Sequence, residues 1–286
     1  MTQKIAVAIL HGIGSQKECF ADDMIRLLKS RFGSEIKDHA SNPEAELVFK
    51  PVFWASVFEN EEKKLWERMK KSGEMDFKRL RLFVINYLAD AIAYQPTIER
   101  YHNYDNVHQV FAESLQYLSE QAGETAPLCV IAHSLGSVIA SNYFYDLQYQ
   151  PEKIRRAVRV KIADTPFAKG ETLTQLHTMG SSLALWSLRF QNFGSAIYVP
   201  APKLSIHHPN LEGGWWNYYD KDDVLGYPLK LLNEQYDRAV TEDIAINVGG
   251  WLTSWNPFSH NHYATDANII NPIAKQLANM WKRLNK

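Results

Sequence analysis

Residues 128–140 (LCVIAHSLGSVIA) constrain the fold more than any other part of the chain. An apolar run typical of a buried strand leads into Ser134, and a helical pattern follows at once. Small residues, Ala132 and Gly136, stand two positions before and after this serine. A sharp strand-to-helix turn tolerates bulk poorly at these two places. The segment therefore predicts a serine held on such a turn, with its hydroxyl pointing out of the sheet.

A serine on this turn becomes a nucleophile only with help from other groups. A base must accept its proton, and an acid must orient that base. The backbone N–H of Leu135, at the start of the expected helix, points to where a carbonyl oxygen would gain negative charge. Serine is also a common helix N-cap, so the turn alone does not establish catalysis. The rest of the chain has to supply the partners.

Strand and helix patterns alternate along the whole chain, which predicts a single α/β domain over residues 1–286. We expect a mostly parallel central sheet with helices on both faces. Strands are expected at residues 4–10, 47–53, from 128, 172–179, 215–219 and 243–248, and helices at residues 18–31 and 135–147. A closing helix is expected with Asn271 as its N-cap and Pro272 in its first position.

The stretch between the second and third strands is longer than one crossover helix requires. Several helical apolar faces occur there, which predicts a cap-like helical insertion at about residues 54–104. These faces are first of all expected to be core packing.

Composition excludes several classes of protein. The 286 residues carry a net charge of about −1 with charges spread along the chain, so neither a nucleic-acid partner nor a polybasic membrane patch is expected. The two cysteines form no disulfide framework, and no apolar run is long enough for a signal peptide or a membrane span. We expect a soluble, cytoplasmic protein, with its oligomeric state left open.

Candidates for the acid and the base follow the last strands, in the order serine, acid, histidine. Asp220, Asp222 and Asp223 stand at the carboxyl end of the strand at 215–219, where open α/β sheets place their sites. Asp223 is preferred and Asp222 is the alternate. His260 and His262 lie between the last strand and the closing helix, and either one could be the base.

The loop after the first strand, His11-Gly12-Ile13-Gly14, predicts the second oxyanion donor. Glycines let the backbone approach a ligand closely, and the N–H of Ile13 is expected to act with that of Leu135. His11 is expected to be a hydrogen-bonded loop residue. The loop has neither the lysine of a Walker loop nor a Gly-x-Gly-x-x-Gly pattern, which argues against a phosphate site.

A metal site is not expected. The histidines at 207, 208, 260 and 262 have no third ligand spaced as zinc sites usually require.

The chain resembles the lipase-like serine esterases of the α/β-hydrolase superfamily. Residues 10–14 match the His-Gly oxyanion loop of that family, and residues 131–136 match its nucleophile turn, with alanine in place of the first glycine. Residues 217–229 are similar to the segment that carries the acid, when Asp223 takes its place. Residues 260–266 resemble the His-x-x-Tyr-Trp-x-Asp segment, with alanine in place of tryptophan, which favours His260 over His262.

The resemblance implies hydrolysis of a small or lipid-like carboxylic ester through an acyl-enzyme, without a cofactor. Ser134 would attack, His260 would move the proton, Asp223 would orient the imidazole, and Ile13 and Leu135 would hold the oxyanion. Thioester or amide cleavage by the same triad is one alternative. A non-catalytic binding module of the same fold is another, because fold does not fix function. Metal-assisted hydrolysis at the histidines is the third.

Overall fold

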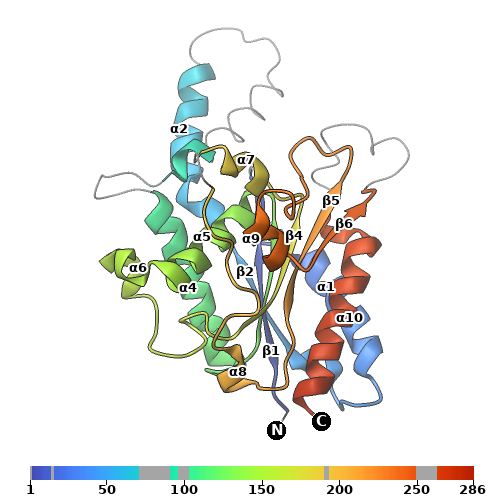
Figure 1. Ribbon diagram of the computed structural model, residues 1–286. Coiled ribbons are helices and arrows are strands. Elements are labelled where there is room, and N and C mark those ends of the chain that lie inside the picture. Colours follow the sequence, from blue (N-terminus) through green and yellow to red (C-terminus); the bar gives the residue numbers. More distant parts are fainter. Residues whose placement is uncertain (1, 14–15, 71–90, 96–102, 190–192, 249–262) are drawn as a thin grey trace.

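The computed structural model describes residues 2–13, 16–70, 91–95, 103–189, 193–248 and 263–286. Six strands form one sheet in the order β2-β1-β3-β4-β5-β6, and every neighbouring pair is parallel (Figure 1). The strands are β1 (Ile5–Leu10), β2 (Leu47–Val52), β3 (Leu128–His133), β4 (Leu173–Met179), β5 (Gly214–Asp220) and β6 (Glu242–Ile246). The expected parallel α/β sheet is confirmed.

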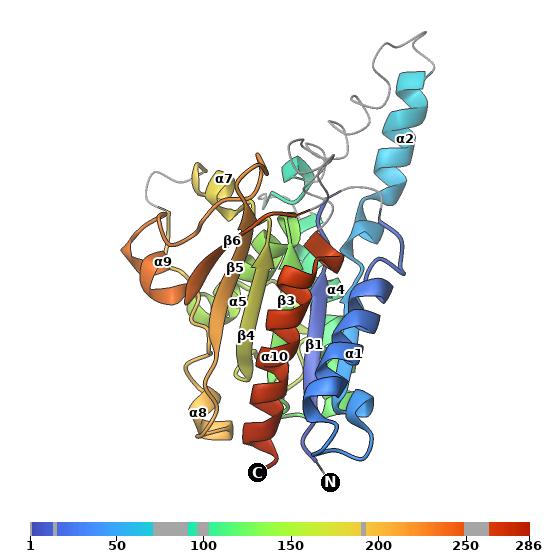
Figure 2. The same ribbon diagram turned by 90° about the vertical axis from the view of Figure 1, so that its right-hand side faces the viewer.

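Helices cover both faces of the sheet. On one face, α1 (Asp22–Ile36) and α10 (Ala267–Leu284) lie side by side (Figure 2). On the other face lie α4 (Asn103–Ala122) and α5 (Leu135–Tyr149). The shorter helices are α2 (Glu59–Lys70), α6 (Arg156–Arg159), α7 (Leu183–Ser187), α8 (Leu204–His207) and α9 (Glu234–Ala239).

The central strands are apolar at successive positions because both of their faces are covered. Every residue of β1 is buried. Its side chains alternate between two cores: Ala6 and Leu10 join the core under α4 and α5, whereas Ile5 and Val7 join the core under α1 and α10. This alternation fixes the register of the sheet, because a one-residue slip would exchange the two faces.

The start of the closing helix differs from the sequence prediction. Helix α10 begins at Ala267, its N-cap is Asp266, and Pro272 lies inside it, so the assignment of Asn271 as N-cap was wrong. The Asp266 carboxylate accepts a 2.7 Å hydrogen bond from the N–H of Asn268 and thereby provides an acceptor for one N–H group of the first turn. The buried apolar residues of that turn extend the helix upstream of the proline.

Two other expected segments are the first helix and the insertion after β2. The first helix begins at Asp22 instead of residue 18, because the residues just before it form turns. Of the expected insertion at residues 54–104, the structure describes a 3₁₀ turn at Trp54–Val57, then α2, residues 91–95 and the start of α4. The remainder lies outside the described residues.

Candidate active site

Ser134 lies on the turn between β3 and α5 in a strained backbone conformation. Its φ is 52° and its ψ is −123°, and it is the one non-glycine residue with positive φ in the described part of the chain. The residue is fully buried, and its hydroxyl has no hydrogen-bond partner among the described residues. Such strain costs about 1–3 kcal/mol and persists only where the surrounding structure enforces it. A strained backbone and an unpartnered hydroxyl together mark a functional position.

Neighbouring backbone holds this turn in place. The N–H of Ser134 donates to the carbonyl of Met179 at the end of β4, at 3.0 Å. Its own carbonyl accepts from the N–H of Ser137 at 3.0 Å and from the Ser137 hydroxyl at 2.5 Å. The Ser137 hydroxyl also lies 2.7 Å from that of Ser181. The turn is therefore tied both to the first turn of α5 and to the end of β4.

The glycine loop after β1 passes directly against the turn. A Cβ added at Gly12 would lie 2.8 Å from the Cβ of Ser134 and 2.7 Å from His133 Nδ1. A Cβ added at Gly136 would lie 2.5 Å from the carbonyl oxygen of His11. Real Cβ atoms do not approach this closely, so only glycine allows the loop and the helix start to meet. The loop after β1 and the start of α5 are therefore in close contact.

His11 anchors this loop, as the sequence predicted. Its Nδ1 donates to the Gly12 carbonyl at 2.6 Å, and its Nε2 accepts from the N–H of Ala55 at 3.3 Å. The ring stacks on Trp54 with centroids 4.4 Å apart, and the indole donates to the His11 carbonyl. Burial lowers the pKa of His11 to about 4, so the ring is neutral near pH 7. It positions the loop and does not transfer protons there.

The two expected oxyanion donors belong to the elements that meet at Ser134. Ile13 follows Gly12 and is partly buried against the core under α4 and α5. Leu135 is the first residue of α5, whose N-terminus has no side-chain cap. The first N–H groups of a helix have no acceptor within the helix and are free to bind an anion.

The three candidate aspartates after β5 have different surroundings. Asp223 is buried, and its Oδ1 accepts from the N–H of Leu225 at 2.9 Å while its Oδ2 accepts from the Tyr263 hydroxyl at 2.8 Å. Asp222 is exposed. A fixed, buried carboxylate suits the orientation of an imidazole, whereas an exposed one does not hold a geometry.

Asp220 has a structural role. Its Oδ1 accepts from the N–H of Asp222 at 2.9 Å, and its Oδ2 accepts from the N–H of Val248 at 2.6 Å. It thereby ties the turn after β5 to the chain that leaves β6. Both of its oxygens therefore accept from backbone N–H groups.

Two glycines make room for Asp223. Gly180, directly after β4, has φ +50°, and a Cβ there would lie 3.0 Å from Asp223 Oδ2. A Cβ at Gly226 would lie 2.6 Å from the same oxygen. Because Gly180 directly follows Met179, whose carbonyl binds the N–H of Ser134, only the end of β4 separates the serine turn from the carboxylate. The contacts of Gly226 and Tyr263 with the acid were not predicted from the sequence.

His260 and His262, the candidate bases, lie outside the described residues. The described residues on either side of this segment both bind the candidate acids: the N–H of Val248 donates to Asp220, and the hydroxyl of Tyr263 donates to Asp223.

The other histidine pair lies far from Ser134. His207 Nε2 is 3.1 Å from Glu171 Oε2, and His208 Nε2 is 2.6 Å from the Thr125 carbonyl. Glu171 just precedes β4, so this pair lies at the amino end of that strand, opposite the serine turn. Over the described ranges, no group of three or more histidine, cysteine, aspartate or glutamate side chains could hold a metal ion. No described helix is long and apolar enough to cross a membrane.

Comparison with known proteins gives distant structural likeness only. No protein-family model matches the chain, and no curated protein matches it. A Xanthomonas campestris protein assigned to the α/β-hydrolase superfamily is 10% identical with a TM-score of 0.41, covering 98% of this chain and all of its own. An esterase from Rhizomucor miehei is 10% identical with a TM-score of 0.43, covering 99% of this chain and 77% of its own. Function therefore has to be inferred from the site's own residues.

Proposed function

We propose that this chain is a serine hydrolase of the α/β-hydrolase type that cleaves carboxylic esters through an acyl-enzyme. The observation that carries the proposal is Ser134 itself. Its backbone is strained, its buried hydroxyl has no partner among the described residues, and it stands at the N-terminus of α5 against a glycine loop. An N-cap role alone does not account for this combination, because an N-cap serine needs no positive φ and this one makes no hydrogen bond to its helix.

In the proposed reaction the Ser134 hydroxyl attacks the ester carbonyl carbon while His260 accepts its proton. The N–H groups of Ile13 and Leu135 stabilise the negative oxygen of the tetrahedral intermediate. The C–O bond then breaks, and the alcohol leaves with the proton from His260. Water then attacks the acyl-enzyme by the same steps, and the carboxylic acid product is released. Asp223 orients the imidazole and stabilises its protonated form.

Chain connectivity supports the choice of base. His260 precedes Tyr263 by three positions in the sequence. The Tyr263 hydroxyl is bonded to Asp223. His262 precedes Tyr263 directly and remains the alternate base, as Asp222 remains the alternate acid.

Labelling with a fluorophosphonate and hydrolysis of p-nitrophenyl esters test the proposal. Wild type should label with one probe per chain, and Ser134→Ala should abolish labelling and nearly all turnover, by up to about a millionfold. Ser182→Ala is the matched control, because Ser182 is also buried with an unpartnered hydroxyl among the described residues but has an ordinary φ of −88°. It should label like wild type.

Other outcomes select the alternatives. A folded wild type that takes no label would identify a binding module. Activity that is lost on chelation and is indifferent to the probe would identify metal-assisted hydrolysis. Faster turnover of thioesters or amides than of matched esters would change the substrate class and keep the triad.

A further inference from the structure

A cavity lies beside α5, and Ser134 is not part of its lining. Its volume is about 440 Å³, and it lies between α5, α7, α9 and the start of α4. The α5 residues that line it begin at Ser141, seven positions after Ser134 and therefore about 10 Å further along the helix. Five aromatic side chains line it: Tyr104, Tyr145, Trp186, Phe193 and Tyr236.

One carboxylate of this lining, Asp146, is held by a network behind it. Its Oδ2 accepts a 2.8 Å hydrogen bond from the Tyr104 hydroxyl and lies 3.6 Å from His108 Nδ1. His108 Nε2 lies 2.9 Å from the hydroxyl of Tyr94, to which Asn142 donates at 3.3 Å. The network fixes the orientation of the carboxylate.

The other oxygen of Asp146 has no hydrogen-bond donor among the described residues. The Asp146 side chain is 23% exposed, so this carboxylate is only partly hydrated inside an aromatic lining. A carboxylate oxygen that lacks a donor in such surroundings favours a ligand that brings one. Aromatic faces attract organic cations within about 6 Å, and the attraction grows when the cation is desolvated.

We propose that this cavity binds an organic cation, an ammonium group on an aromatic or apolar body. The ammonium would donate to the open oxygen of Asp146, and the body would lie among the aromatic side chains. The neighbouring charges set the orientation: Asp105 adds negative potential at Asp146, Lys153 opposes it, and Arg189 is an exposed cation of the same lining. Arg189 would repel a cation placed beside it, so the ammonium belongs at the Asp146 end.

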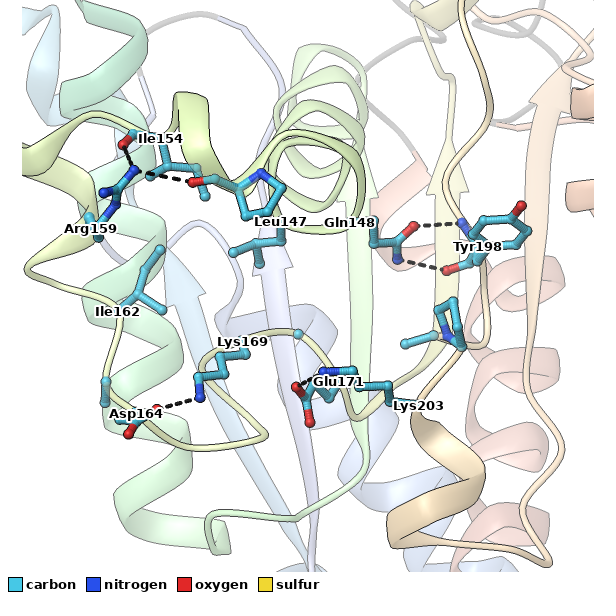
Figure 3. A pocket seen from close by; sticks show the side chains of 15 residues that line it. Leu147, Gln148, Ile154, Arg159, Ile162, Asp164, Lys169, Glu171, Tyr198 and Lys203 are labelled. Carbon is cyan, nitrogen blue, oxygen red and sulfur yellow. Dashed lines mark hydrogen bonds and ion pairs between the residues drawn. The ribbon is translucent and has the colours of Figure 1, made fainter.

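Another cavity, of about 640 Å³, is lined in part by the C-terminal end of α5, and it differs in how its charged side chains are paired (Figure 3). Its charged side chains are already paired within the protein. Lys169 pairs with Asp164, Lys203 pairs with Glu171, and Arg159 donates to backbone carbonyls. It offers apolar surface without a charged group to orient a ligand.

Calorimetric titration with three probes tests the proposal. Tyramine carries the cation, 4-ethylphenol lacks it, and tyrosine adds a carboxylate. Tyramine should bind wild type at least about tenfold more tightly than 4-ethylphenol, the factor expected for one hydrogen bond to a charged group. Asp146→Asn should abolish that preference while still accepting from Tyr104. Asp164→Asn is the matched control, because that carboxylate is 93% exposed and lines the other cavity.

Four results would overturn the proposal. The first is equal binding of tyramine and 4-ethylphenol to wild type, which needs no variant to fold. The second is an unchanged tyramine affinity in folded Asp146→Asn. The third is tighter binding of tyrosine than of tyramine, which would assign recognition to Arg189 and a carboxylate. Absence of binding at about 1 mM of every probe also counts against it.

Discussion

The hydroxyl of Tyr263 donates a 2.8 Å hydrogen bond to Asp223 Oδ2, from a position forty residues further along the chain. The same hydroxyl accepts from the N–H of Asp220 at 2.9 Å. Burial and the adjacent Asp223 raise the pKa of Tyr263 well above its usual value, so the phenol stays protonated and able to donate. One side chain thereby connects the approach to α10 with the turn after β5 that carries the candidate acid.

Removing this hydroxyl should affect both stability and activity. Tyr263→Phe removes the acceptor of the buried Asp220 N–H and the hydroxyl that donates to Asp223 Oδ2, so the free energy of unfolding should fall by about 1–3 kcal/mol. If Asp223 is the acid, kcat should fall more than KM changes. Tyr227→Phe is the control, because among the described residues its hydroxyl bonds just the nearby Val224 carbonyl at the surface. Denaturant unfolding and ester kinetics measure the two effects, and equal behaviour of both variants would contradict the role of Tyr263.

Backbone strain at Ser134 predicts an unusual order of stability. Alanine retains a Cβ at φ 52°, whereas glycine adopts this region without cost. Ser134→Gly should therefore unfold at a free energy about 1 kcal/mol higher than Ser134→Ala. At Ser182, where φ is −88°, glycine should be the less stable of the two substitutions. A Ser134→Ala variant that is as stable as Ser134→Gly, or more stable, would contradict strain at this turn.

Substitutions of the neighbouring Asp222 and Asp223 should have different effects on kcat. Asp223→Asn keeps an acceptor for its partners but cannot hold the imidazole in the correct tautomer, so kcat should fall by about 10⁴ with folding retained. Asp222→Asn changes an exposed side chain and should match wild type. A large loss in the second variant and none in the first would make Asp222 the acid.

Burial of His11 predicts a loss of stability in acid. Its folded pKa of about 4 lies below the ordinary value of 6.5, so its contribution is present above pH 6.5 and is lost as the pH falls toward 4. The loss amounts to about 3 kcal/mol. His11→Gln should have a shallower pH dependence of unfolding below pH 6.5. Exposed His39→Gln should follow wild type, and an unchanged slope in His11→Gln would refute the assignment.

The pKa of Asp146 predicts a pH dependence of stability opposite in sign to that of His11. Burial, opposed by the Tyr104 hydrogen bond, raises the pKa of Asp146 from 3.8 to about 6. The protonated form is therefore favoured in the folded state, and this stabilisation is present below pH 3.8 and lost as the pH rises through 6. Relative to wild type, Asp146→Asn should gain about 3 kcal/mol of stability between pH 4 and pH 8. Urea unfolding at pH 4 and pH 8 measures the gain. A difference in unfolding free energy between wild type and Asp146→Asn that is the same at both pH values would contradict the prediction.

The sequence alone determined the local features. The alternation of strand and helix patterns along the chain predicted the parallel sheet. Small residues around Ser134 predicted the sharp turn. Both patterns depend on residues close together in the chain. The glycine loop at residues 11–14 was likewise recognised from adjacent residues alone. The start of α10 was misjudged because a proline after an asparagine is a typical helix start, whereas burial of the preceding turn decided the boundary.

Only the tertiary structure decided which groups meet. The sequence ranked Asp223 first and Asp222 as its alternate among three neighbouring aspartates, and packing gave Asp220 and Asp223 different partners, Val248 and Tyr263. The aromatic cavity beside α5 was likewise not predictable, since its lining comes from four helices and the loops between them. Such contacts join segments that are distant in the chain, and local sequence patterns do not encode the distances between them.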